Sequence, residues 1–202
     1  MNRPPAVILA GGRATRMGGG DKGFRMVAGQ RLIDHVILRL QAQCGAMAIN
    51  ANGDPGRFAD FGLPVLADTL PDHPGPLAGV LAGMEWAADQ GADAIISVAA
   101  DTPFFPHDLV TRLMAARGPS GLVLAASPDA SGRMQRQPTF GLWPVALRHD
   151  LNRALGAGLR KIVLWTEAHH ATTAEFSALP FDPFFNVNSP EDINAANMLV
   201  GK

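Results

Sequence analysis

Cysteine and long hydrophobic runs are both scarce in this chain of 202 residues. The only cysteine, Cys44, excludes an intramolecular disulfide and leaves no set of thiolates for a structural zinc site. We expect Cys44 to pack in the core of a protein of the reducing cytoplasm. No apolar run approaches the ~20 residues of a membrane helix. No signal peptide is expected, because the first strand is predicted to begin at Ala6.

Charged side chains are also few, at 17% of the sequence, and the formal net charge is −1. A nearly neutral protein has no overall attraction for nucleic acid or for an anionic membrane, so we expect neither as a partner. A bound anion would have to be held by a local group of cations. The hydrophobic content of 47% supports a full core, and no linker or repeat divides residues 1–202, so we predict a single domain.

Glycine, in contrast, is concentrated near the N-terminus. The apolar run Ala6–Leu9 leads into residues 10–22, which hold five glycines and the three cations Arg13, Arg16 and Lys22. Glycine lets the main chain approach an anion closely, and the cations supply countercharge. Together with the preceding strand, these residues favour a phosphate-binding loop over an ordinary surface turn.

Two familiar phosphate-binding loops do not fit this segment. Gly18, Gly20 and Gly23 have the spacing of a dinucleotide-binding fingerprint, but no helix is predicted directly after them. A P-loop requires a lysine followed by serine or threonine, whereas Lys22 is followed by glycine. The segment therefore belongs to another class of phosphate site.

The order of the apolar segments predicts an α/β fold. Several runs are apolar throughout rather than alternating, which is typical of strands in a parallel sheet covered on both faces, and helical patterns separate them. We predict a three-layer, doubly wound, mostly parallel sheet of the Rossmann-like kind. The predicted strands are 6–9, 46–50, 65–67, 94–100 and 122–126, with helices near 32–42, 79–90 and 107–116.

The pattern is weaker in the last third of the chain. We predict a strand at 140–143, helices at 145–155 and 160–168, a short strand at 185–187, and a terminal helix at 190–199 capped by Ser189. On a strand, Asn186 and Asn188 would point to the same face. A turn before the helix cap is the alternative interpretation of these asparagines.

Polar residues follow several of the predicted strands. Asn50, Asp68 and Asp101 each stand where a strand ends, as does the glycine-rich loop. Ligands of doubly wound sheets lie at these carboxyl ends, so we expect a shared crevice. Asp101 suits Mg²⁺, which often binds one or two carboxylates together with substrate phosphates, but a turn or a helix cap explains it equally well. Asn50 and Asp68 could also close turns on their own backbone.

The histidines and hydroxyl residues form no catalytic pattern. Among the six histidines, only His169 and His170 are adjacent, and neighbours in sequence seldom face one ion together. No Ser/His/Asp or Cys/His arrangement is recognisable. A phosphate monoester is already ionised near neutral pH, because its second pKa is about 6, so an enzyme that uses it as nucleophile needs no general base.

The glycine-rich loop resembles the signature of the MobA-like nucleotidyltransferases, the family of the molybdenum cofactor guanylyltransferases. That signature is Leu-Ala-Gly-Gly, then Arg-Met-Gly, then Asp-Lys, and residues 9–22 contain all of it. The resemblance continues in family order at 50–52, 68, 75–79, 101–103, 137–139 and 185–191. Ala10-Gly11-Gly12 stands where relatives that transfer cytidylyl groups usually have Ala-Ala-Gly, so the resemblance favours GTP over CTP.

The resemblance implies roles for individual residues. Arg16, Lys22 and Asp101 would act on the phosphates as catalytic residues, and Asp101 would hold Mg²⁺. The N-terminal part would bind GTP, and the C-terminal part, with Asn186 and Asn188, would border the pterin. The implied binding residues are Leu9, Ala10, Gly11, Gly12, Lys22, Asn50, Asp68, Asp101, Asn186 and Asn188.

The implied reaction is transfer of GMP from GTP to the terminal phosphate of molybdopterin, with release of pyrophosphate. The product, a guanine dinucleotide form of the cofactor, would pass on through transient contacts with molybdoenzymes or cofactor-insertion proteins. Two alternatives stay open: a cytidylyl or other nucleotidyltransferase with another phosphorylated acceptor, and a non-catalytic chaperone that binds nucleotide and pterin. Intact Asp21, Lys22 and Asp101 argue against the chaperone, which would have less need for a metal.

Overall fold

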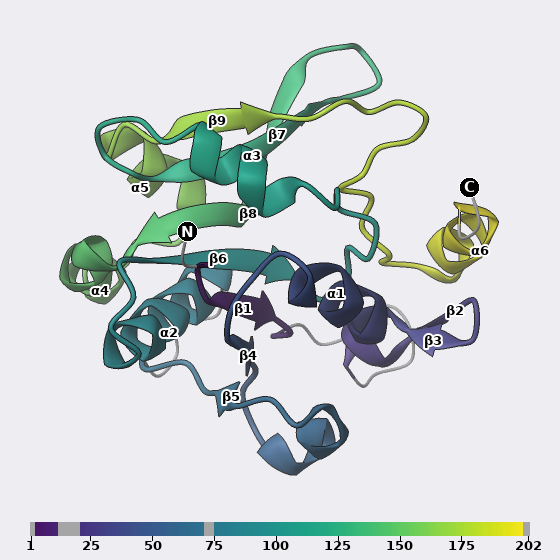
Figure 1. The fold of residues 1–202 in the computed structure, drawn as a ribbon, viewed down its shortest axis with the longest axis horizontal. Coiled ribbons are helices and arrows are strands. Elements are labelled where there is room, and N and C mark those ends of the chain that lie inside the picture. The colour runs from purple at the N-terminus through teal and green to yellow at the C-terminus, as the bar shows by residue number, and fades with distance from the viewer. Residues whose placement is uncertain (1–2, 12–20, 71–74, 200–202) are drawn as a thin grey trace.

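A seven-stranded sheet between two layers of helices forms the centre of the computed structural model, which describes residues 3–11, 21–70 and 75–199 (Figure 1). The strands of this sheet are β1 (Ala6–Leu9), β4 (Met47–Asn50), β5 (Val65–Leu66), β6 (Ala94–Ala99), β7 (Val123–Pro128), β8 (Met134–Pro144) and β9 (Thr172–Glu175). Across the sheet they follow the order β5–β4–β1–β6–β8–β7–β9. The predicted α/β fold is confirmed.

All strands of this sheet except β8 run in the same direction. β1 pairs in parallel with β4 and β6, β4 pairs in parallel with β5, and β7 pairs in parallel with β9. β8 is antiparallel to both of its neighbours, β6 and β7. An antiparallel pair can be joined by a tight turn, so β7 passes directly into β8 without a crossover helix. The predicted mostly parallel, doubly wound sheet is therefore confirmed.

Helices cover both faces of the sheet. They are α1 (Leu32–Gln41), α2 (Pro76–Asp89), α3 (Leu109–Ala115), α4 (Arg148–Gly156) and α5 (Ile162–Ala168). The last helix, α6 (Pro190–Leu199), lies beside a small hairpin instead (Figure 1). Shorter elements are the 3-10 turns η2 (Lys22–Phe24), η3 (Pro55–Phe61) and η4 (Val145–Leu147), and a hairpin of β2 (Met26–Val27) and β3 (Gln30–Arg31). The predicted helix over 160–168 is confirmed as α5, and the one over 145–155 is divided between η4 and α4.

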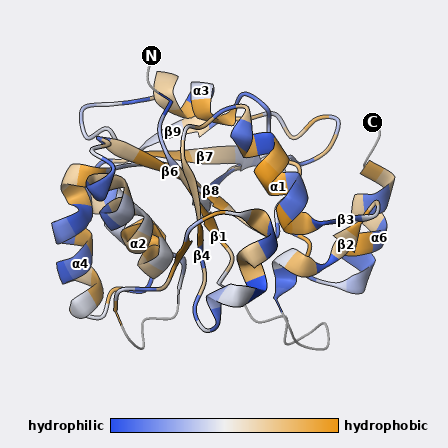
Figure 2. Cartoon of the chain, turned by 60° about the horizontal axis from the view of Figure 1, so that its bottom comes forward, coloured by the Kyte–Doolittle hydropathy of each residue, from blue (hydrophilic) through white to orange (hydrophobic). Residues whose placement is uncertain are grey.

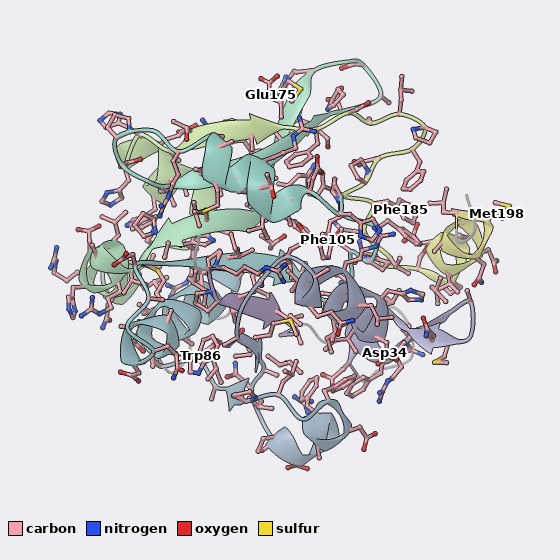
Figure 3. All side chains as sticks on the ribbon, in the orientation of Figure 1. Asp34, Trp86, Phe105, Glu175, Phe185 and Met198 are labelled. Atoms are coloured by element: carbon pink, nitrogen blue, oxygen red, sulfur yellow. The ribbon has the colours of Figure 1, made fainter. Side chains whose placement is uncertain are left out.

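Alternate side chains of β1 enter two separate hydrophobic layers. Ile8 packs in the layer that contains Val36 of α1 and Leu113 of α3, whereas Val7 packs in the layer that contains Leu81 of α2. The central strands are correspondingly apolar on both faces, as the colours of β1, β4 and β6 indicate (Figure 2). Phe105, labelled in Figure 3, is buried in the same layer as Ile8. The layers hold the carboxyl ends of the strands at one edge of the sheet.

A third, smaller hydrophobic cluster joins the two ends of the chain. Val27 of the hairpin, Phe104 and Val187 are buried together with Ala196 of α6. The backbone N–H of Ala28 donates to Oδ1 of Asn197 at 2.7 Å, which ties the hairpin to α6. The C-terminal segment is thereby brought to the same edge of the sheet as the N-terminal loop.

The predicted strand at 185–187 is wrong. The segment is irregular. Its backbone makes one hydrogen bond of the kind found between strands, in which Val187 N donates to Asp101 O at 2.9 Å. Its neighbour at this point is the turn after β6 rather than a strand, so a regular ladder has no partner. β9 was not predicted, because its sequence, Thr-Thr-Ala-Glu, lacks an apolar run and buries only Ala174 at the edge of the sheet.

Cys44 occupies the position expected for a packing residue. Its side chain is 3% exposed, and burial raises the pKa of the thiol to about 12, so the thiolate is strongly disfavoured.

In the described part of the chain, no helix has both the length and the apolar character needed to cross a membrane.

Candidate active site

The carboxyl ends of the parallel strands β1, β4, β5 and β6 lie next to one another, along the side of the sheet where these strands end. The backbone N–H of Ala10 donates to Asn50 O at 2.9 Å, and the N–H of Ala100 donates to Leu9 O at 3.1 Å, so the three central strand ends are fixed to one another. A pocket opens at this edge. Its lining residues are Leu9, Ala10, Gly11, Lys22, Gly23, Ala100 and Asp101.

Lys22 reaches the pocket from the short turn η2. The next residue, Gly23, is buried, and a Cβ built on it would lie 3.3 Å from Ala100 Cβ and 3.5 Å from Ile33 Cβ. A larger residue would push the turn away from the end of β6. Gly23 therefore sets how closely Lys22 approaches the end of that strand.

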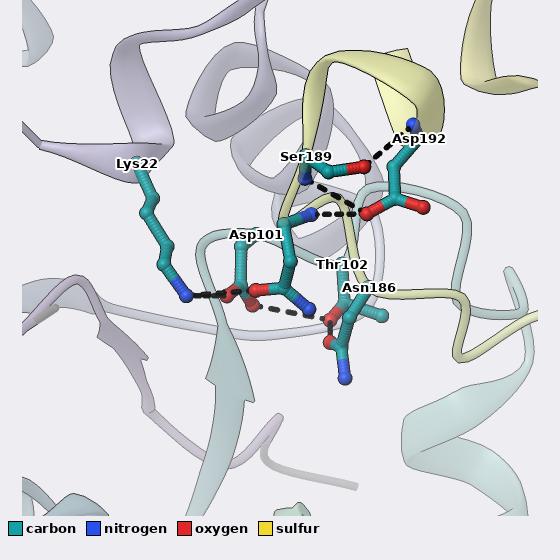
Figure 4. Close-up of polar contacts among 7 residues, drawn as sticks. Lys22, Asp101, Thr102, Asn186, Ser189 and Asp192 are labelled. Carbon is teal, nitrogen blue, oxygen red and sulfur yellow. Dashed lines mark hydrogen bonds and ion pairs between the residues drawn. The ribbon is translucent and has the colours of Figure 1, made fainter. Parts of the chain in front are cut away.

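Lys22 contacts two side chains from distant parts of the sequence (Figure 4). Its Nζ donates to Asn188 Oδ1 at 2.7 Å and lies 3.7 Å from Asp101 Oδ2. The lysine and aspartate side chains are 30% and 22% exposed, so both are partly shielded yet open to a ligand. An ammonium group has three protons, so Lys22 can donate to further oxygens at the same time.

Asp101 is partly buried at the end of β6. Burial raises the pKa of its carboxyl above the usual range, and the Lys22 ammonium and the Thr102 hydroxyl partly offset that effect. Thr102 Oγ1 lies 3.3 Å from Asp101 Oδ1 and also forms a short hydrogen bond to Asn186 Oδ1. Asn186 is thus linked to the Asp101 carboxylate through Thr102, and Asn188 is linked to it through Lys22, although the strand predicted to align the two asparagines is not there.

The position of Asn188 is fixed by the cap of α6. Asp192 Oδ2 accepts from the backbone N–H groups of Asn188 and Ser189, each at 2.8 Å. Ser189 Oγ accepts in turn from the N–H of Asp192 at 3.2 Å, so Ser189 caps the helix as predicted. The reciprocal cap places the asparagine rigidly beside Lys22.

Asn50 and Asp68 meet at the ends of β4 and β5. Asn50 Nδ2 donates to Asp68 Oδ1 at 2.9 Å and to Leu66 O at 3.1 Å, and the asparagine is only 5% exposed. Asn52 Nδ2 donates to Asp68 Oδ2 at 2.8 Å, and Asn52 Oδ1 accepts from the Asp68 N–H at 2.9 Å. Asn50 is thus mainly a support for Asp68, whose carboxylate remains partly exposed.

Helix α2 passes close to this pair. A Cβ on Gly79 would lie 2.1 Å from Asn50 Oδ1 and 2.8 Å from Leu9 Cδ2, so the position admits no side chain without displacement of its neighbours. Gly11 also lies near, since its Cβ would be 3.9 Å from Asn50 Oδ1. The pocket beside Lys22 and the carboxylate of Asp68 therefore border the same loop.

The predicted site residues form two adjoining groups. Lys22, Asp101, Asn186 and Asn188 make one, and Asn50 with Asp68 makes the other. Leu9, Ala10 and Gly11 line the pocket. Gly12 and Arg16 lie outside the described residues. Asn52, Thr102 and Arg57 were not predicted as site residues. Asn52 and Thr102 stand in the matching stretches 50–52 and 101–103, which could have pointed to them, whereas only its contacts in the fold connect Arg57 to the site.

A magnesium ion would find one carboxylate here. Among the described residues, no three His, Cys, Asp or Glu side chains gather as a metal-binding set. Mg²⁺ needs no such set when substrate phosphates and water supply its other ligands. Asp101 carries its carboxylate on the lining of the pocket, so the residues present fit a metal shared between protein and phosphate.

This arrangement suits chemistry on phosphates. The pocket combines a lysine ammonium, one aspartate and backbone at the end of a strand, and the two asparagine side chains supply further polar groups. Fixed cations beside a metal-binding carboxylate stabilise charge that moves between phosphate oxygens.

Known proteins similar to this chain have related activities. The family model of the MobA-like NTP transferase domain matches residues 6–172. A molybdenum cofactor guanylyltransferase of Rhodopseudomonas palustris (strain BisB5) is 50% identical over 198 residues, which cover 96% of this chain and 93% of the relative. Another, of Nitrobacter hamburgensis, is 49% identical over 201 residues, covering 97% and 95%.

Solved structures share the fold at low identity. A molybdopterin-guanine dinucleotide biosynthesis protein A from Archaeoglobus fulgidus has a TM-score of 0.69 at 21% identity and covers 96% of this chain and 97% of its own. A CMP:2-keto-3-deoxy-manno-octonic acid synthetase complexed with CTP has a TM-score of 0.72 at 16% identity, with 98% of each chain covered. On the family match and on relatives that are about half identical along nearly their whole length, this chain belongs to the MobA-like NTP transferase family, alongside the molybdenum cofactor guanylyltransferases.

Proposed function

We propose that this protein transfers GMP from GTP to the terminal phosphate of molybdopterin, releasing pyrophosphate and forming the guanine dinucleotide cofactor. The activity named for its relatives supports this reaction. The structural observation that carries the proposal is the meeting of Lys22 and Asp101 at one pocket, with Asn188 hydrogen-bonded to Lys22. A cation and a metal-binding carboxylate at the junction of two chain segments are what transfer between two phosphates requires.

The triphosphate of GTP would lie along the glycine-rich loop. Leu9, Ala10 and Gly11 line the pocket, and the resemblance adds Gly12 and Arg16 to the same site. Lys22 would donate to the phosphate oxygens on which negative charge builds as pyrophosphate leaves. Removal of such a fixed donor typically costs about a hundredfold to a thousandfold in rate.

The nucleoside would face Asp68. Guanine carries two neighbouring donors, its ring N–H and its amino group, and one carboxylate can accept from both. Asn50 and Asn52 each donate to one oxygen of Asp68, which fixes the plane of the carboxylate. Asn50 would act through Asp68, since both of its amide protons are already donated within the protein.

Asp101 would hold Mg²⁺, and the ion would supply positive charge that stabilises a transferring phosphoryl group. Burial raises the pKa of the Asp101 carboxyl, and the Lys22 ammonium opposes that effect, as a bound cation would.

The acceptor would enter from the C-terminal side. Asn186 and Asn188 offer amide groups to the pterin phosphate and orient it toward the α-phosphorus of GTP. The attacking phosphate is ionised at neutral pH, so no side chain has to remove a proton. Alignment of the two substrates would supply much of the rate acceleration.

We also propose that residues 1–202 act as one domain in the cytoplasm and pass the product on by transient contacts with molybdoenzymes or cofactor-insertion proteins. The single cysteine is consistent with a reducing compartment. Neither nucleic acid nor a membrane is expected to bind, because the net charge is close to zero.

One assay tests the reaction. The purified protein is incubated with Mg²⁺, molybdopterin and each of the four nucleoside triphosphates, and both pyrophosphate and dinucleotide product are measured. We expect product with GTP and little with the others. Product formed chiefly with CTP would assign a cytidylyltransferase, and GTP binding with no pyrophosphate release would assign a carrier.

A further inference from the structure

Arg57, in η3, joins two parts of the site that are separate in sequence. Its Nη1 donates to Asp21 Oδ1 at 3.1 Å and lies 2.9 Å from Asp21 Oδ2. Its Nη2 donates to the backbone oxygen of Asn52 at 2.6 Å, and its Nε donates to the backbone oxygen of Asp54 at 3.0 Å. A planar guanidinium fixes several acceptors in set directions, which an ammonium group cannot do.

The Asp21 contact acts on the turn that carries Lys22. Asp21 stands at the N-cap of η2, yet its side chain makes no capping hydrogen bond there. The carboxylate, 15% exposed, is paired with Arg57 instead. The side chain of the residue directly before Lys22 is therefore anchored to η3, while its backbone oxygen accepts from Phe24 N–H within the turn.

The Asn52 contact acts on the other part of the site. Arg57 holds the backbone of Asn52, and the Asn52 side chain exchanges two hydrogen bonds with Asp68, one to its carboxylate and one from its N–H. A continuous chain of polar contacts thus runs from Asp68 through Asn52 and Arg57 to Asp21, which precedes Lys22.

We propose that Arg57 is a positioning residue that fixes the separation of Lys22 and Asp68. The inference rests on the proposed function, in which Lys22 contacts the triphosphate of GTP and Asp68 contacts the base. One nucleotide has to meet both groups at once, and a misplacement of about 1 Å can cost about a hundredfold in rate. Arg57 acts through its two neighbours and needs no contact with GTP.

Arg31 provides a matched control. Arg31 and Arg57 are 30% and 32% exposed, and each pairs with a carboxylate. The Arg31 guanidinium lies 4.2 Å from the ring centre of Phe61, and that of Arg57 lies 5.0 Å from the ring centre of Phe58. Arg31 pairs with Asp34 and Asp60 rather than with Asp21. If Arg57 only stabilised the fold, Arg57→Ala and Arg31→Ala would lose activity to a similar extent.

The test compares steady-state rates and nucleotide preference in Arg57→Ala, Asp21→Asn, the double variant and Arg31→Ala. We expect Arg57→Ala to lose about tenfold to a hundredfold in kcat/KM for GTP and to lose part of its preference for GTP over ATP. Asp21→Asn, which keeps the side-chain shape, should lose rate but keep the preference, because the Asn52 contact stays. The double variant should be no slower than Arg57→Ala.

The outcomes distinguish failure of the positioning role of Arg57 from failure of the proposed active site. Equal rates and equal preference in Arg57→Ala and Arg31→Ala would overturn the positioning role, as would fully additive losses in the double variant. Asp21→Asn keeps the test decisive if Arg57→Ala folds poorly, since wild-type rates in that variant would also overturn it. Lys22→Ala is measured in parallel. Undiminished turnover in Lys22→Ala would refute the assigned site itself. A large loss of turnover in Lys22→Ala with no loss in Arg57→Ala would refute only the positioning role.

Discussion

Lys22 and Asn188 stand 166 positions apart in sequence, yet Lys22 Nζ donates to Asn188 Oδ1 at 2.7 Å. The reciprocal cap of α6 holds Asn188 in place. The contact links the N-terminal segment that we assign to the nucleotide with the C-terminal segment that we assign to the acceptor. The two proposed substrate sites would therefore be coupled through the Lys22 ammonium group.

Replacement of Asn188 by alanine should separate binding from turnover. We expect kcat to fall about tenfold, because the acceptor side of Lys22 loses its fixed partner, while the Kd for GTP changes by less than about threefold. Calorimetry with GTP and a pyrophosphate-release assay measure the two effects. Asn197→Ala is the control, since Asn197 binds the hairpin at Ala28 rather than the pocket. Equal losses in both variants would contradict a specific role for Asn188.

Gly79→Ala should damage the base-facing part of the site. The new Cβ would lie 2.1 Å from Asn50 Oδ1, so Asn50 would have to leave its position beside Asp68. We expect a loss of about 1–3 kcal/mol in the free energy of unfolding and weaker GTP binding. Gly156→Ala is the control, because the last residue of α4 has open space around its Cβ. It should gain up to about 1 kcal/mol in denaturant unfolding.

Asp150 should give stability that depends on pH. Its Oδ1 accepts from His169 Nε2 at 2.7 Å and from Trp165 Nε1 at 3.0 Å, and the His169 contact lowers the pKa of the Asp150 carboxyl. A lowered pKa means that the folded state binds the proton less tightly than the unfolded state. The stabilisation is therefore complete above the ordinary pKa of about 3.9 and is lost as pH falls through the lower value.

Asp150→Asn tests this pH dependence. At pH near 7 we expect the variant to be less stable by up to about 1 kcal/mol, since the side chain is partly exposed. The difference from the wild type should shrink as pH falls below the ordinary carboxyl pKa. Unfolding curves that stay equally far apart across the whole pH range would show that the charge is not responsible.

Asp101→Asn should trade activity against stability. Burial raises the pKa of the Asp101 carboxyl, so ionisation costs stability above that raised value, and the cost disappears as pH falls toward the ordinary pKa. The amide carries no such cost. We expect turnover to fall by about a hundredfold to a thousandfold while the Tm at neutral pH stays equal or rises. A lower Tm together with the lost turnover would indicate a structural role instead.

Much of the fold could be predicted because its strands are buried on both faces. The run Ala94–Ala99 is apolar except for Ser97, is buried along its whole length and lies in the centre of the sheet, so its pattern is strong. β9 lies at the edge, where Thr172 and Thr173 are only partly buried, and its polar sequence carries no such signal. The strand expected at 185–187 failed because a short apolar pattern does not say whether a neighbouring strand is available for pairing.

The site was predictable where residues follow strands directly. Asp68 and Asp101 stand at strand ends, and the topology alone brings those ends to one edge. Arg57 lies in a 3-10 turn of ordinary composition, and its partner Asp21 is 36 residues away. The sequence contains no periodic signal for such a pairing, so only the folded structure connects it with Lys22.

The most direct test of the account is a crystal structure of the protein with Mg²⁺ and a non-hydrolysable GTP analogue. We expect the triphosphate in the pocket lined by Gly11 and Lys22, the ion on Asp101 and the base against Asp68. A nucleotide bound elsewhere, with Lys22 and Asp101 still facing each other across an empty pocket, would contradict it.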